Sequence, residues 1–135
     1  MTADSPAGYL AEFHEAFGIH RESTPTHPPD GIAALCLRVL DEEIAEVSEA
    51  VGSGSLADVA HELADVVYAA YGMALAHGID LDAVLAEVHR ANMSKLDAEG
   101  KAVRRDDGKV VKSDLFRPAD VVAVLRQQIG NTPDA

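Results

Sequence analysis

The uncharged run 66–76 constrains the fold more than any other feature of this chain. It follows Asp65, presents no charged side chain on any face of a helix, and is followed by Gly78, a common helix-end signal. A helix that is apolar on all sides is buried by neighbouring helices. The run is too short to cross a bilayer, which takes about 20 apolar residues. We therefore predict a helix in the centre of a helical bundle or in the interface between two copies of the chain.

Apolar spacing and cap residues divide the rest of the chain. Expected helices cover residues 6–17, 32–51, 55–76, 80–96 and 118–128. Ser55 and Asp80 stand where the third and fourth helices need N-caps. The Asp107-Gly108 turn, between short β-prone pieces, predicts a small hairpin within residues 100–112. We expect an all-α fold: an antiparallel bundle of four to five helices with a short C-terminal hairpin segment, and dimeric.

Length and composition narrow the function classes. The 135 residues fit one domain over residues 1–135, with 1–4 and 130–135 as loose ends. The net charge of −12 argues against a nucleic-acid polymer as partner. Cys36 is the single cysteine, so no disulfide framework is expected, and no segment reads as a signal peptide or membrane span. These features predict a cytoplasmic protein without a membrane partner.

Paired carboxylates carry the functional prediction. Glu43 and Glu46 lie three residues apart on the second expected helix, and Glu62 and Asp65 on the third, so each pair shares one helix face. Glu42 stands beside the first pair. Such acids packed together would repel, whereas a divalent cation held by oxygens removes that cost, and Mg²⁺ is typically bound by carboxylates and substrate phosphates. The alternative is a solvated acidic stripe.

Other polar residues on apolar faces are open to two interpretations. Asn92 and Lys95 extend the inner face of the fourth expected helix, where a lysine needs an anion or must reach solvent from the helix end. His61 precedes Glu62 and lies four residues from Asp65, so it could contact the carboxylates that would bind a metal. His14 is expected at the surface, and the alternative is that it hydrogen-bonds a ligand. Cys36 is expected in inert packing.

Glu42-Glu43-x-x-Glu46, followed after fifteen intervening residues by Glu62-x-x-Asp65, resembles the motif of the all-α nucleoside triphosphate pyrophosphatases. That superfamily includes MazG-type enzymes, dimeric dUTPases and phosphoribosyl-ATP pyrophosphatase. The segment 88–96 is similar to its Asn-x-x-Lys element, and segments 13–18 and 107–112 resemble flanking elements of the phosphoribosyl-ATP pyrophosphatase-like branch. The resemblance covers most of residues 9–125.

The resemblance implies hydrolysis of a nucleoside triphosphate between the α and β phosphates, with Mg²⁺ as cofactor and Mn²⁺ able to substitute. By carry-over, the catalytic residue is Glu42, which orients or deprotonates water or else serves as a ligand. The implied metal ligands are Glu43, Glu46, Glu62 and Asp65, and the implied substrate-binding residues are Asn92, Lys95, Lys109 and Lys112. The first-choice substrates are dUTP and dCTP, and phosphoribosyl-ATP is the alternative.

The sequence also bears on two other function classes. A di-iron bundle needs a Glu-x-x-His unit on each of two helices, and the chain offers only Asp58-x-x-His61. A non-catalytic acidic helical module would bind a partner protein and respond to neither Mg²⁺ nor a triphosphate. The apolar third helix also predicts a homodimer of antiparallel helical hairpins, or a dimer of two such dimers.

Overall fold

The computed structural model describes residues 4–130, so most of the loose ends expected at 1–4 and 130–135 lies outside the described residues. Gly130 was expected to be loose but is the last residue of a helix. Five helices and one two-stranded sheet make up this part of the chain, which confirms the all-α prediction. None of these helices combines the length and apolar character that crossing a membrane would require. The described residues form two compact units, residues 4–82 with 128–130 and residues 83–127. The assignment of the whole chain to one domain stays a prediction.

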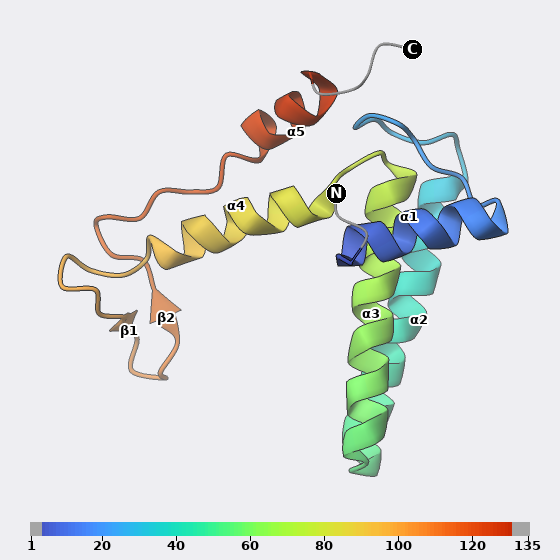
Figure 1. The fold of residues 1–135 in the computed structure, drawn as a ribbon. Coiled ribbons are helices and arrows are strands. Elements are labelled where there is room, and N and C mark those ends of the chain that lie inside the picture. The colour runs from blue at the N-terminus through green and yellow to red at the C-terminus, as the bar shows by residue number, and fades with distance from the viewer. Residues whose placement is uncertain (1–3, 131–135) are drawn as a thin grey trace. The chain divides into compact units, whose positions relative to one another are not determined.

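An antiparallel pair of long helices dominates the first unit (Figure 1). Helix α2 spans Ile32–Ser53 and helix α3 spans Leu56–Ala76. Gly54 ends α2 in the left-handed conformation, at a φ of 76°, which a residue without Cβ adopts at little cost. Ser55 then caps α3 by accepting a hydrogen bond from the Asp58 N–H at 3.2 Å. This tight turn sets the two helices side by side along their length.

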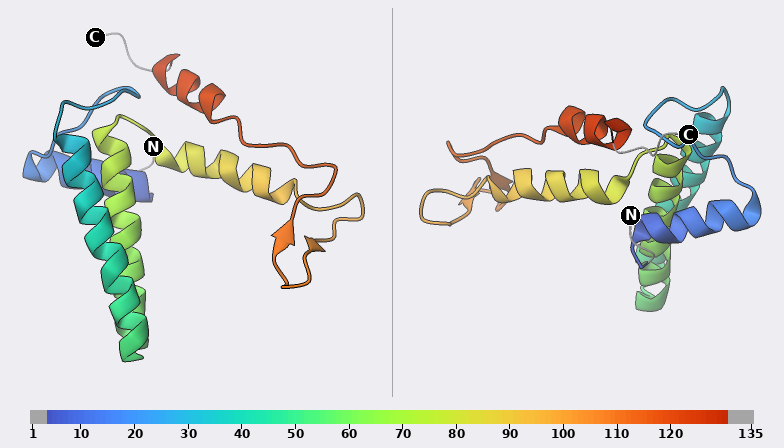
Figure 2. Two further views of the ribbon diagram at one scale, coloured as in Figure 1. Left: turned by 180° about the vertical axis from the view of Figure 1, so that it is seen from behind. Right: turned by 45° about the horizontal axis from the view of Figure 1, so that its top comes forward.

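Helix α1, Pro6–Phe17, packs against α3 (Figure 2). Ser5 caps it, and Gly18 ends it with a φ of 64°. The buried apolar cluster between these helices consists of Ala7, Leu10, Tyr71 and Leu75. The core of the first unit therefore lies at the C-terminal half of α3, where the uncharged run predicted burial.

The second unit contains most of α4 (Leu81–Met93), the hairpin and most of α5 (Val121–Gly130). Strands β1 (Val103–Arg104) and β2 (Val110–Val111) pair antiparallel, with Val103 opposite Val111. Gly108 occupies the turn at a φ of 85°, as the Asp-Gly pair predicted. Glu87 links α4 to the start of α5 by accepting a hydrogen bond from the Asp120 N–H at 3.0 Å.

Two expected helix boundaries were wrong. Helix α4 ends at Met93, so Lys95 lies beyond it, because the Ser94 hydroxyl donates to the Ala91 carbonyl at 2.7 Å and the next amides bond three residues back. Helix α5 begins at Val121 rather than at residue 118, because Asp120 caps it by accepting from the Ala123 N–H. Asn92 and Lys95 therefore do not share one helix face.

Candidate metal centre

Four carboxylates, one pair from each helix of the α2–α3 hairpin, meet in one place. They are Glu43, Glu46, Glu62 and Asp65, and we call them the acidic quartet. One oxygen from each can be chosen so that all four atoms lie within 4.8 Å of one another. The arrangement follows from the sequence spacing, because residues three apart on an α-helix share a face and the hairpin turns the two faces together.

Two oxygen atoms of the quartet have no hydrogen-bond partner in the described part of the chain. These are Oε2 of Glu43 and Oε2 of Glu62, both shielded from solvent. A shielded acceptor without a donor is unfavourable, and more so when it is charged. The arrangement is therefore suited to an additional positive group that both oxygens can contact.

The electrostatics of the quartet point the same way. Burial raises the pKa of Glu43, and the charges of Glu46 and Asp65 raise it further. The pKa of Glu62 is raised first by its hydrogen bond with Glu46 and then by burial. A hydrogen bond between two carboxyl groups needs a proton on one of them. In the absence of a cation, the quartet thus tends to retain a proton that a cation would displace.

The ligand chemistry of the quartet fits a hard divalent cation. All four side chains offer oxygen only, which suits Mg²⁺, Mn²⁺ or Ca²⁺ rather than a metal that prefers sulfur or imidazole. Glu46 is exposed while the other three are partly buried, so one side of the site is open to water or to a phosphate group. Carboxylates that leave coordination positions to water and phosphate are typical of Mg²⁺ sites.

His61 contacts the quartet from outside. Its Nε2 lies 3.3 Å from Oδ2 of Asp65, one helical turn further along α3. The His61 side chain is 71% exposed and that of Asp65 is 38% exposed. The imidazole can orient Asp65, but solvent screening makes such a pair weak.

The remaining candidate residues are distributed over both units. Glu42 is exposed on α2 next to Glu43, outside the quartet. Asn92, Lys95, Lys109 and Lys112 all belong to the second unit. In that unit the Lys112 ammonium group lies 4.7 Å from the centre of the Phe116 ring, a cation–π contact. The roles of these five residues stay predictions.

An apolar cavity of about 330 Å³ lies between α1, α2 and α3. Val39 and Ala69 line it, and they stand four residues, about one helical turn, from Glu43 and Asp65 respectively. Phe13, Tyr68 and Gly72 contribute to its walls. The cavity thus begins about one turn of each helix from the quartet.

His14 lines the same cavity, and the expectation of a surface histidine was wrong. It is only 4% exposed. The signal was present in the sequence: His14 follows Leu10 by four residues and so shares the inward face of α1 with it. The default that polar residues face solvent concealed this position.

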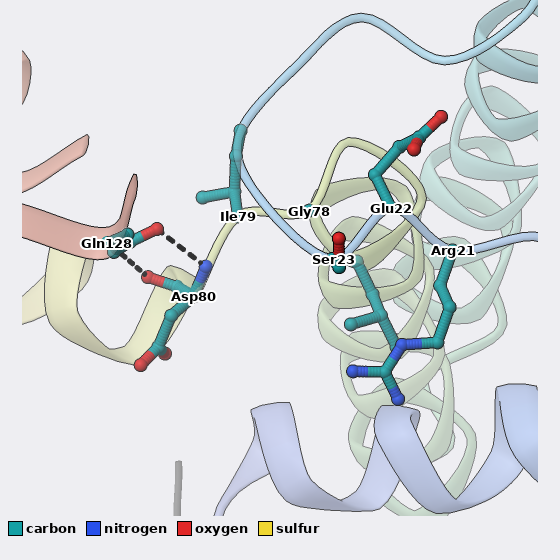
Figure 3. A pocket seen from close by; sticks show the side chains of 8 residues that line it. Arg21, Glu22, Ser23, Gly78, Ile79, Asp80 and Gln128 are labelled. Carbon is teal, nitrogen blue, oxygen red and sulfur yellow. Dashed lines mark hydrogen bonds between the residues drawn. The ribbon is translucent and has the colours of Figure 1, made fainter. Parts of the chain in front are cut away.

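A second hollow, of about 280 Å³, lies at the far end of α3 from the quartet (Figure 3). There the side-chain amide of Gln128 both accepts from the Asp80 N–H at 2.9 Å and donates to the Asp80 carbonyl at 3.0 Å. Arg21 and Glu22 also line this hollow. The paired hydrogen bonds fix the chain between α3 and α4, and we interpret this end as structural.

Comparison with known proteins supports the resemblance of the motifs. A family described as phosphoribosyl-ATP pyrophosphohydrolase matches residues 10–92, more than half of the chain. The matched segment contains α1 from residue 10 onward, the α2–α3 hairpin with the whole quartet, and Asn92 at its last position. Among curated proteins, the chain finds no match.

Proposed function

This chain belongs to the phosphoribosyl-ATP pyrophosphohydrolase family of the all-α MazG-like nucleoside triphosphate pyrophosphatases, and on that premise we propose that it hydrolyses phosphoribosyl-ATP or a close analogue. Membership supports a pyrophosphohydrolase that acts on a nucleotide-like substrate. The bond broken is the anhydride between the α and β phosphates, and the products are a nucleoside monophosphate and pyrophosphate. The single observation that carries the proposal is the convergence of four carboxylate oxygens within 4.8 Å in this family's matched segment.

In this proposal Glu43, Glu46, Glu62 and Asp65 hold Mg²⁺, for which Mn²⁺ can substitute. The bound cation supplies charge neutralisation at the phosphate oxygens. The orphaned oxygens of Glu43 and Glu62 support this ligand set. The exposed carboxylate of Glu46 stands at the open side, where a phosphate can approach.

Glu42 is the proposed general base. Its carboxylate accepts the proton of the attacking water as the new P–O bond forms and the bridging P–O bond breaks, so that pyrophosphate leaves. Exposure next to Glu43 gives it access to water. General-base assistance of this kind contributes about 10²–10⁴-fold in rate.

Asn92, Lys95, Lys109 and Lys112 are the proposed contacts to the phosphate chain. Lysine ammonium groups act as point charges suited to phosphate oxygens. The three lysines belong to the second unit, which holds most of the basic residues of the chain. Their removal is expected to weaken substrate binding more than turnover.

This proposal reverses the ranking of candidate substrates that the sequence analysis gives. The sequence interpretation favoured dUTP and dCTP, whereas the family match favours phosphoribosyl-ATP. The deciding experiment measures pyrophosphate release from phosphoribosyl-ATP and from each common ribo- and deoxyribonucleoside triphosphate, with Mg²⁺ and with Mn²⁺. Preference for a deoxypyrimidine triphosphate would restore the original order, and no release from any of them would refute the enzyme.

Site variants test the mechanism with a matched control. Glu46→Ala and Asp65→Ala are expected to lose pyrophosphate release while remaining folded by circular dichroism. Asp41→Ala removes an exposed carboxylate from α2 outside the quartet and is expected to retain activity. Full activity in either quartet variant would show that the metal ligands are wrongly assigned.

We also propose that the protein is a homodimer, or a dimer of two such dimers. Large apolar side chains remain exposed on the α2–α3 hairpin of one chain, among them Leu37, Ile44, Leu63 and Val67 at about half exposure each. Where exposed apolar side chains form a contiguous patch, they mark an interaction site. A monomeric mass from light scattering at micromolar concentration would contradict the proposal.

A further inference from the structure

The cavity beside the acidic quartet is apolar except for one buried ring. Among residues 4–130, His14 and Tyr71 are the side chains with a polar group that are more than nine-tenths buried, and only His14 lines this cavity. Its Nδ1 lies 3.1 Å from the backbone carbonyl oxygen of His20. No partner for its Nε2 is found among residues 4–130.

The partner of Nδ1 determines which atom of His14 carries the proton. A carbonyl oxygen only accepts hydrogen bonds, so Nδ1 must be the donor. In a neutral imidazole the other nitrogen then carries a lone pair and accepts. Burial lowers the pKa of His14 from 6.5, which keeps the ring neutral at pH 7.

The free nitrogen lies at the cavity wall opposite a glycine. A Cβ added to Gly72 would lie 3.6 Å from Nε2 of His14 and 3.6 Å from Cδ1 of Leu10. Both His14 and Gly72 line the cavity. The missing side chain at position 72 therefore leaves room for a ligand atom next to Nε2.

The position of this acceptor relative to the quartet suits a nucleotide. Gly72 follows Asp65 by seven residues, about 10 Å along α3. That span is comparable to the reach from the edge of a nucleobase to its phosphates. At about 330 Å³ the cavity is at the small end for ligand sites, so it fits a planar base rather than a whole nucleotide.

We propose that Nε2 of His14 selects nucleobases with an exocyclic amino group, as in adenine and cytosine, against their oxo counterparts, hypoxanthine and uracil. An amino group donates a hydrogen bond to the lone pair of Nε2. An oxo group at the same position sets two acceptors against each other in a largely apolar cavity, which is unfavourable. The inference rests on the proposed function in that it takes the quartet to bind the phosphates of the same ligand.

The test uses pairs of product nucleotides that differ only in this group. Dissociation constants are measured by calorimetry, in Mg²⁺, for AMP against IMP and for CMP against UMP. Wild-type protein is expected to bind the amino member of each pair about tenfold more tightly or better. Equal affinity, or preference for the oxo member, would overturn the proposal.

Variants assign the preference to the nitrogen. His14→Phe keeps a ring but removes the acceptor, so the amino-to-oxo ratio is expected to fall to about one. Gly72→Ala is compatible with the packing and covers Nε2 with a methyl group, and it is expected to reduce the ratio likewise. His27→Phe alters an exposed histidine outside the cavity and serves as the control. A ratio unchanged in either cavity variant contradicts the role of His14.

Two outcomes separate this inference from the proposed function. Selective binding of AMP and CMP without pyrophosphate release from any triphosphate would refute the enzyme and retain the role of His14. Pyrophosphate release without discrimination between amino and oxo bases would support the enzyme and refute the role of His14. If His14→Phe does not fold, nitrogen NMR of wild-type protein replaces it: the Nε2 resonance must show an unprotonated acceptor that shifts on adding AMP and not on adding IMP.

Discussion

Replacing Glu62 by glutamine should stabilise the protein without cations and remove its stabilisation by Mg²⁺. Glu62 belongs to a group of four carboxylates whose oxygens lie within 4.8 Å, and its pKa is raised by its hydrogen bond with Glu46 and by burial. Glutamine has nearly the same shape, carries no charge and brings two N–H donors to this cluster of acceptors. The cation-free variant is therefore expected to melt at a higher temperature than the cation-free wild type.

The increase in the melting temperature of the wild type on binding a cation can be calculated. Binding to the folded state alone adds about 2.7 kcal/mol to the free energy of unfolding at a cation concentration 100 times the dissociation constant. For a chain of 135 residues, the entropy of unfolding is about 0.28 kcal/mol per kelvin. Saturating Mg²⁺ should thus raise the melting temperature by about 10 °C. Glu62→Gln should lose most of this rise.

Differential scanning calorimetry with and without Mg²⁺ or Mn²⁺ measures both effects. Asp41→Asn is the matched control, because it removes one exposed carboxylate from the same hairpin outside the quartet. It should show the full wild-type response to the cation. The reasoning would be refuted if the melting temperature of the wild type did not change with either cation at about 10 mM. It would also be refuted if Glu62→Gln melted at a lower temperature than the cation-free wild type.

Three further predictions concern folding. Leu10→Ala should lower the free energy of unfolding by about 2–5 kcal/mol in a denaturant titration, since Leu10 is 2% exposed in the core of the first unit, and a loss below about 1 kcal/mol would contradict that packing. Gly78→Ala should lower the free energy of unfolding by more than the roughly 1–2 kcal/mol that the left-handed backbone conformation costs, because the new Cβ would clash with the Thr24 carbonyl. A melting temperature close to that of the wild type would contradict this. The raised pKa values of Glu43 and Glu62 mean that the folded state keeps protons that the unfolded state has lost, so the free energy of unfolding without cations should fall as pH rises above about 4.5. Melting temperatures of wild type and Glu62→Gln, measured from about pH 4 upward, isolate this contribution. The same pH dependence in both proteins would exclude it.

Local signals were sufficient to predict most helix boundaries. Helix α1 begins and ends where Pro6 and Gly18 predicted, and Ser55 caps α3 as expected. Such boundaries depend on hydrogen bonds between residues a few positions apart, and those are encoded in short stretches of sequence. The end of α4 was missed because the Ser94 hydroxyl competes for the Ala91 carbonyl, and apolar periodicity contains no information about that bond.

The site was only partly predictable, for a different reason. The two carboxylate pairs could be placed on helix faces from their spacing, and a short turn at Gly54 made their meeting the natural outcome. The spacing from Leu10 indicates that His14 lies on the inward face of α1, but no local pattern reports which residues of α3 it faces, such as Gly72 about sixty positions away. Preference for one nucleobase depends on such long-range contacts. For this reason the sequence motif predicts the class of reaction better than the identity of the nucleobase.

The distribution of charge supports the proposal that a cation binds at this site. Only two basic residues, Arg21 and Arg38, precede position 82, while that part of the chain contains the quartet and most of the other acids. A polyphosphate approaching the α2–α3 hairpin meets like charge, and like charges at contact distance are strongly unfavourable in partly shielded surroundings. The lysines proposed to contact the phosphates would attract the substrate but would not relieve the repulsion within the quartet itself. A divalent cation acts on both, because it neutralises the carboxylates that bind it and presents positive charge to the phosphate.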